Sequence, residues 1–135
     1  MADIGSFRTK WSSRILSVLR IITGFLYMQH GAQKLFGVPS GPTNVQVDLF
    51  SLLGVAGLLE FFLGMLILVG LFTRFAAFIL CGQMAAAYFM VHAPKGFWPI
   101  LNQGELAVLY CYIYLYLAVA GGGSWSLDRL RKKNS

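Results

Sequence analysis

The sequence predicts an all-α protein, specifically an integral membrane four-helix bundle with both termini in the cytoplasm. Three observations lead to this fold class: an apolar composition, four long apolar segments, and basic residues concentrated beside one set of segment ends. Hydrophobic residues make up 57% and charged residues 12% of the 135 positions, whereas about a quarter of a soluble domain is charged. Four spans of about 20 residues use roughly 80 positions, so no separate soluble domain fits.

The four apolar segments lie at about 15–36, 49–72, 75–91 and 106–120. Only Thr73 and Arg74 separate the second segment from the third, so these two helices are expected to be antiparallel neighbours. The connections at 38–42 and 93–104 each contain two prolines and cannot continue a helix. We therefore expect a single transmembrane domain over residues 1–135.

The position of the charges predicts the orientation. The net charge is +6, and most of the basic residues precede the first segment, occupy the tight turn or follow the fourth segment. Lys34 and Lys95 are the two basic residues at the opposite ends. By the positive-inside rule, the termini and the tight turn lie in the cytoplasm of a multi-pass protein of the bacterial inner membrane. The basic residues then set topology or contact anionic lipid, and no nucleic-acid partner is expected.

Two cysteines are expected to remain unpaired. Cys81 lies about seven residues above the cytoplasmic turn and Cys111 about six below the outer end of the fourth segment. At 1.5 Å per residue their depths then differ by about 10 Å, which exceeds the Cα separation of about 7 Å that a disulfide tolerates. Buried, inert thiols are the expected state.

Ionisable groups inside the apolar segments indicate a candidate site, because a charge at that depth needs a partner, a cavity or a function. Glu60 lies near the middle of the second segment, on the same face as Gly57 and Gly64. His30 lies about 22 Å and Glu60 about 18 Å from the cytoplasmic side, so the two are within reach of each other. Arg20, at about 8 Å, is too low for contact unless its side chain extends upward.

A second group of polar residues gathers at the predicted outer rim, where it could surround the same cavity. Its members are Lys34, His92, Trp98, Asn102 and Glu105. Each also has a purely structural explanation: Asn102 and Glu105 suit a helix N-terminus, Trp98 suits an interfacial aromatic belt, and Lys34 suits a side chain that extends to the interface. A structural hydrogen bond between His30 and Glu60 is as well supported as a reactive pair.

Motifs for other chemistries are not found in the sequence. It contains no glycine-rich phosphate loop, no serine-centred nucleophile elbow, no zinc-type His-Glu-x-x-His and no flavin motif. Two histidines on different segments leave haem ligation formally open, and no metal site is expected.

Four stretches together resemble the DoxX family of small bacterial membrane proteins. These stretches are RIITGFLYMQHGAQKLFG (20–37), GLLEFFLGMLILVGLFTR (57–74), HAPKGFW (92–98) and NQGELAVLY (102–110). One departure is Gln103, where the family pattern has a second glycine. The resemblance implies a four-helix membrane protein, often labelled an oxidoreductase, with relatives linked to quinone-dependent redox chemistry. The matching positions are Arg20, His30, Gly31, Lys34, Glu60, Thr73, Arg74, His92, Asn102 and Glu105.

Two functional hypotheses follow. In the first, a membrane redox subunit binds a quinone or similar lipid-soluble molecule near the outer leaflet; Glu60 and His30 act in proton transfer, and Lys34, His92, Trp98, Asn102, Glu105 and Arg20 help to bind it. A partner protein carrying a cofactor would then be needed. In the second, the protein is a non-catalytic scaffold or assembly subunit whose polar cluster is structural, and small residues such as Ala85 and Ala86 allow a homo-oligomer. The sequence leaves open whether the protein is an enzyme.

Overall fold

The chain is all-α. The computed structural model describes residues 3–41 and 47–135, and this part of the chain contains helices and no strands. Pro42, within the predicted first connection, lies outside the described residues. In chain order the elements are α1 (Ile4–Phe36), α2 (Leu52–Val69), α3 (Thr73–Ala87), the π-helical turn η1 (Tyr88–His92), the 3-10 turn η2 (Ala93–Lys95), α4 (Pro99–Asn102), α5 (Glu105–Ala120) and α6 (Leu127–Lys133).

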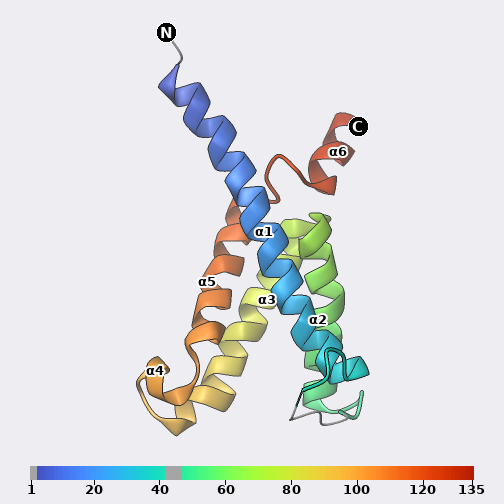
Figure 1. Cartoon of the computed structure of the whole chain (residues 1–135), viewed down its shortest axis with the longest axis vertical. Coiled ribbons are helices and arrows are strands. Elements are labelled where there is room, and N and C mark those ends of the chain that lie inside the picture. The colour runs from blue at the N-terminus through green and yellow to red at the C-terminus, as the bar shows by residue number, and fades with distance from the viewer. Residues whose placement is uncertain (1–2, 42–46) are drawn as a thin grey trace.

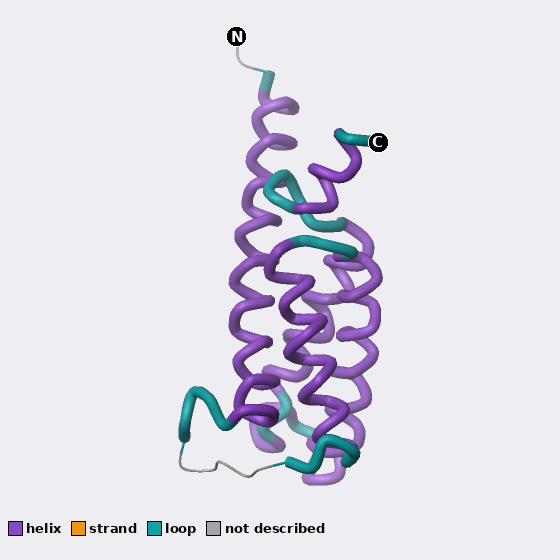
Figure 2. Tube along the Cα trace, turned by 90° about the vertical axis from the view of Figure 1, so that its right-hand side faces the viewer, coloured by secondary structure: helices purple, strands orange, loops and turns teal. Residues whose placement is uncertain are grey.

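Four long helices, α1, α2, α3 and α5, lie side by side along the molecule (Figures 1 and 2). The most extensive packing is between α1 and α2 and between α3 and α5, so the molecule consists of two tight helix pairs. The two chain termini and the turn between α2 and α3 lie at one end, whereas α4 lies at the other (Figure 1). We call these the terminal end and the α4 end.

The helix boundaries follow local capping signals. α1 begins at Ile4, eleven residues before the predicted span, because the Asp3 carboxylate accepts a hydrogen bond from the Gly5 N–H. It ends where Gly37 adopts a left-handed conformation. Ser51 caps α2 in the same way, and Gly70 ends it.

Two helical segments of the described chain are long and apolar enough to cross a membrane, Leu52–Val69 and Thr73–Lys95. The apolar helix α5 has 16 residues and matches the predicted fourth segment at 106–120, but its length of about 24 Å is shorter than the roughly 30 Å core of a bilayer. α1 is long enough, but its polar residues lower its mean hydropathy. The structure therefore supports membrane-helix character most directly for the second and third predicted spans.

Glycines allow α1 and α2 to pack with their backbones in contact. A side-chain carbon at Gly24 would lie 2.6 Å from the backbone nitrogen of Leu68, and one at Gly31 would lie 2.5 Å from that of Phe61. Neither position has room for a larger residue. Such small-residue contacts are typical of helix pairs in membranes.

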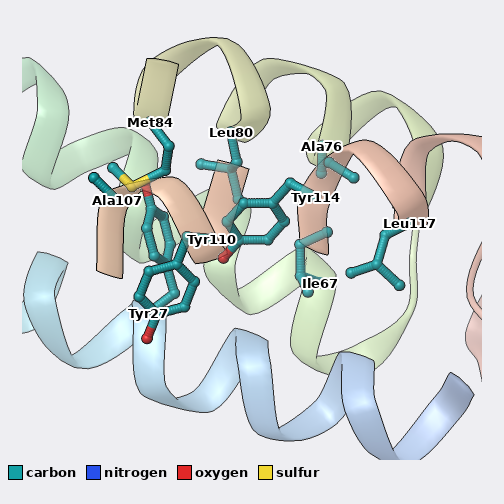
Figure 3. Close-up of a cluster of buried hydrophobic side chains, with 10 residues drawn as sticks. Tyr27, Ile67, Ala76, Leu80, Met84, Ala107, Tyr110, Tyr114 and Leu117 are labelled. Atoms are coloured by element: carbon teal, nitrogen blue, oxygen red, sulfur yellow. The ribbon is translucent and has the colours of Figure 1, made fainter. Parts of the chain in front are cut away.

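A cluster of aromatic rings fills the centre between the two helix pairs. Tyr27 of α1 meets Tyr110 and Tyr114 of α5, with ring centroids 5.1 Å apart in both cases (Figure 3). Leu80 and Ile67 complete the cluster from α3 and α2. Because Tyr112 and Tyr116 are exposed, the tyrosines of α5 divide between a buried and an exposed face.

The predicted separation of the two cysteines is wrong. Cys81 Sγ and Cys111 Sγ lie 3.7 Å apart across the α3–α5 interface, and both thiols are free. The error arose because the depth of Cys81 was measured from one side of the membrane and that of Cys111 from the other, with the full thickness of a membrane assumed between them. Because α5 spans only about 24 Å, Cys111, six positions after the first residue of α5, already lies level with Cys81.

Candidate functional site

A cavity of about 420 Å³ lies between the two helix pairs, toward the α4 end. Its wall is mostly apolar, with contributions from Leu53, Ala56, Met84 and Leu106 among others. The polar side chains that line it are Tyr27, His30, Lys34, Glu60, Gln83, His92, Gln103 and Tyr110. A mostly apolar pocket with a few convergent polar groups has the usual character of a small-molecule site.

Glu60 is the buried acid of this cavity, with a residue exposure of 4%. Its two carboxylate oxygens lie 2.6 and 2.8 Å from the Nζ of Lys34, and Gln83 donates a further hydrogen bond at 3.4 Å. The ion pair is possible because Gly57 has no side chain: a carbon there would lie 3.0 Å from the Lys34 Cβ. Residues from α1, α2 and α3 thus converge on one carboxylate.

His30 lines the cavity, but it is not the partner of Glu60. The structure records no hydrogen bond between these two side chains; the His30 ring instead packs 6.4 Å from that of Tyr110, in an edge-to-face arrangement. Lys34, one helical turn further along α1, reaches the carboxylate in its place. The predicted distances from the cytoplasmic side identified the part of α1 that lies beside Glu60, but they did not identify Lys34 as the residue that binds it.

Arg20 lies far from this cavity, near the terminal end, and is completely buried. Its guanidinium donates hydrogen bonds to the carbonyl oxygens of Ile67 and Leu68 at 2.6 Å each, and to those of Gly122 and Trp125. Ile67 and Leu68 belong to the last turn of α2, where backbone carbonyls lack the N–H donors of a following helical turn. The Ile67 carbonyl also accepts a hydrogen bond from the Gly70 N–H at 3.2 Å. Arg20 therefore closes the end of α2 and ties it to the segment after α5.

The four remaining predicted residues divide between the cavity and its surroundings. His92 lines the cavity, and its Nδ1 lies 3.0 Å from the carbonyl oxygen of Asn102. Asn102 is buried and holds the loop at the α4 end together through hydrogen bonds with Gly96 and Gly104. Trp98 and Glu105 are exposed and are not among the residues that line the cavity.

Sequence reasoning missed Gln83 and Tyr27 as cavity residues. A signal for Gln83 was available, since an amide in the middle of an apolar segment needs a partner as an acid does. Its Nε2 donates to the Ala56 carbonyl and to Glu60, whereas its Oε1 and the buried hydroxyl of Tyr27 have no partner within the described residues. Gln83 Oε1 and the Tyr27 hydroxyl can therefore each form a hydrogen bond with a ligand in the cavity.

Gln103 shows why a glycine is expected at its position. It adopts a left-handed conformation with φ of 62°, which glycine tolerates best. The departure from the expected pattern therefore leaves the turn intact and places a glutamine side chain at the cavity.

Apolar helices around a cavity with a buried ion pair define a membrane-associated helical protein. The chain belongs to the DoxX family, whose sequence model matches residues 15–93. It is also similar to a protein of Haemophilus influenzae described as uncharacterized, with 42% identity over 123 residues that cover 88% of this chain and 92% of the relative. No solved structure matches the chain.

Proposed function

We propose that this protein is a multi-pass protein of the bacterial inner membrane in which α1, α2, α3 and α5 form a four-helix bundle with both termini in the cytoplasm. The charge distribution supports this orientation, because eight basic residues belong to the termini and to the α2–α3 turn, all at the terminal end (Figure 1). The α4 end, with the cavity, then lies toward the outer leaflet.

We propose further that the cavity binds a quinone or a similar lipid-soluble molecule with ring carbonyls. The observation that carries this proposal is the partly buried Lys34–Glu60 ion pair within a mostly apolar cavity of about 420 Å³. The size lies within the range of about 300–1,000 Å³ that is usual for small-molecule sites. Apolar walls suit a ring and its hydrocarbon tail, and the polar groups suit two carbonyl oxygens.

The polar groups have complementary roles in this proposal. Lys34 has a third N–H beyond the two directed at Glu60, so it can donate to a carbonyl oxygen. His30, His92 and the unpaired hydroxyl of Tyr27 are further donors at the cavity wall. Glu60 and His30 would accept or supply the proton that accompanies quinone reduction or oxidation. Trp98, Asn102 and Glu105 would act from the outer rim.

A redox role requires a second protein. The cavity offers hydrogen bonds and proton transfer, whereas the electrons would come from a partner that carries a cofactor. The family resemblance to proteins labelled as oxidoreductases favours this arrangement.

The test is a titration of the purified protein with menaquinone and ubiquinone analogues. Glu60→Gln and Lys34→Met should each weaken binding by at least about tenfold, because each removes a charged hydrogen-bonding group worth about 1.5–3 kcal/mol. Asp48→Asn is the control, since this exposed acid lies outside the cavity. Unchanged binding in both cavity variants would reject the proposal.

The alternative function is a non-catalytic scaffold, and one observation favours it: Arg20 and the Lys34–Glu60 pair both connect separate helices. Under this alternative, Glu60→Gln lowers the thermal stability of the protein and leaves quinone binding, if any is measured, unaffected. The same titration therefore separates the two functions.

A further inference from the structure

The side-chain amide of Gln83 gives the wall of the cavity at the α4 end a hydrogen-bond acceptor of defined orientation. Its Nε2 donates to the backbone carbonyl of Ala56 at 3.3 Å and to Glu60 Oε1 at 3.4 Å. A backbone carbonyl can only accept, so the contact with Ala56 fixes which end of the amide is the nitrogen. The other end, Oε1, is therefore an acceptor.

This acceptor is buried and lacks a donor. Gln83 Oε1 makes no hydrogen bond within the described residues. Most buried amide oxygens in proteins are paired, because an unpaired one loses its contact with water and gains nothing in return. A ligand with an O–H group can supply the missing donor, whereas a ligand whose only polar atoms are carbonyl oxygens cannot.

The unpaired acceptor lies beside the cation that the proposed function assigns to the ligand. Gln83 Nε2 and Lys34 Nζ both contact the Oε1 atom of Glu60, at 3.4 and 2.6 Å. An amide from α3 and an ammonium from α1 thus meet at one carboxylate oxygen. A hydroxyl group can accept from the ammonium and donate to an amide oxygen at the same time, but a quinone carbonyl can only accept.

Glu60 adds a second acceptor of the same kind. A carboxylate has about four acceptor positions, and the contacts with Lys34 and Gln83 use three of them. The unpaired hydroxyl of Tyr27, by contrast, can either donate or accept, so it does not discriminate between the two kinds of ligand. The groups that do discriminate in this part of the cavity are acceptors.

We propose that the cavity binds the reduced form of its ligand, the quinol, more tightly than the quinone, and that Gln83 is the residue that determines this preference. The inference rests on the proposed quinone site. Both forms present the same ring and tail to the apolar wall and an oxygen to Lys34, but only the quinol has an O–H for Gln83 Oε1. A site that pairs with a ligand hydroxyl discriminates against an analogue that lacks it.

The preference has a consequence for redox chemistry. Tighter binding of the reduced form raises the midpoint potential of the bound quinone–quinol couple, and a tenfold difference in affinity corresponds to about 30 mV for two electrons. A quinone in the cavity is then a stronger oxidant than the same quinone in the membrane.

The experiment measures equilibrium dialysis of a short-tailed ubiquinone analogue against the full-length protein in detergent, without oxygen, once with the oxidised and once with the reduced form. Wild type should bind the quinol about tenfold more tightly, as expected for one hydrogen bond. Gln83→Met, which keeps the length of the side chain and removes the amide, should reduce this ratio to about twofold or less. Gln33→Met is the matched control, since this amide is exposed and lies outside the cavity.

A modified ligand tests the same point on the wild-type protein. The dimethyl ether of the quinol keeps the ring and the tail but has no O–H group, so it should bind no more tightly than the quinone. Binding of the ether as tight as that of the quinol would overturn the inference, because the preference would then come from shape.

The outcomes separate this inference from the proposed function. Equal binding of the two forms, or tighter binding of the quinone, overturns the inference and leaves the quinone site standing. Absence of binding of either form overturns both. A quinol preference that Gln83→Met retains to the same extent as Gln33→Met overturns the role of Gln83.

Discussion

The sulfur atoms of Cys81 and Cys111 lie 3.7 Å apart, one on α3 and the other on α5. These two helices form one of the two extensively packed pairs in the molecule. The contact therefore reports the register of α3 against α5 directly. It also brings two thiols from the apolar part of the chain within reach of a common oxidant.

We expect the two thiols to form a disulfide when the membrane-embedded protein is treated with copper phenanthroline, because only a small side-chain rotation separates their sulfurs from bonding distance. Loss of free thiols to a maleimide reagent, reversed by dithiothreitol, measures the product. Cys111→Ser is the control and should show no intramolecular product. Persistence of both free thiols in the wild-type protein would show that α3 and α5 pack in another register.

Replacement of Arg20 should destabilise the fold more than replacement of another arginine. Arg20→Leu leaves the carbonyl groups of Leu68 and Trp125 without their donor and removes the guanidinium from those of Ile67 and Gly122. Each buried unpaired carbonyl costs about 1–3 kcal/mol, so we expect a total loss above about 3 kcal/mol. Thermal unfolding in detergent measures the effect. Arg8→Leu, at an exposed position of α1, should change the unfolding temperature little.

The helices were predictable from the sequence because apolar runs, prolines and glycines are local signals. A tight turn between the second and third segments and the start of α5 at Glu105 followed from them. The turn lies at residues 70–72, however, and the predicted turn residues 73 and 74 already belong to α3. The early start of α1 was not predicted, since polar residues such as Arg8 and Lys10 obscure a helix that continues beyond the apolar run. The Asp3 cap is the local signal that indicates it.

The sequence predicted which residue types form the candidate site, but only partly which side chains contact one another. Buried charge identified Glu60, because the cost of an ionisable group in an apolar helix depends on the sequence alone. Lys34 was predicted only as a residue of the rim. Which partner Glu60 selects depends on helix rotation and on the space that Gly57 leaves, and both are tertiary properties. For the same reason, the predicted depth of Arg20 in the membrane did not reveal that its guanidinium donates hydrogen bonds to backbone carbonyls near the terminal end.

Asp128 caps the start of α3, where its carboxylate accepts hydrogen bonds from the Phe72 and Thr73 N–H groups, and this cap should make stability depend on pH. Partial burial acts to raise the pKa of Asp128, but hydrogen bonds from the backbone N–H and side chain of Thr73 and from the Phe72 N–H, with the charge of Arg131, outweigh it. The pKa therefore lies below its ordinary value of 3.8. A lowered pKa in the folded state means that the stabilisation is complete above the ordinary value and is lost as the pH falls through the lowered one.

Asp128→Asn should therefore destabilise the protein at neutral pH by about 0.5–2 kcal/mol, the usual contribution of a helix cap. The difference from wild type should shrink as the pH is lowered below the ordinary pKa of Asp128. Thermal unfolding across this range measures it, with Asp3→Asn at the exposed start of α1 for comparison. A difference that stays constant down to about pH 2 would contradict the capping role.

The Lys34–Glu60 ion pair should show strong coupling in a double-mutant cycle. Lys34→Met alone leaves the Glu60 carboxylate buried without its cation, and Glu60→Gln alone leaves the ammonium without its anion. Removal of one partner from a fully buried pair costs about 3–5 kcal/mol. Because the Lys34 side chain is 28% exposed, we expect a smaller cost of about 1–3 kcal/mol for each single variant.

The double variant, Lys34→Met with Glu60→Gln, should recover part of that loss, since no unpaired charge remains in the cavity. Thermal unfolding in detergent measures all four proteins of the cycle. A double variant whose loss equals the sum of the two single losses would indicate that the two side chains act independently. Gln83→Leu added to each protein tests the second hydrogen bond to Glu60, and its effect should be largest where the carboxylate has lost Lys34.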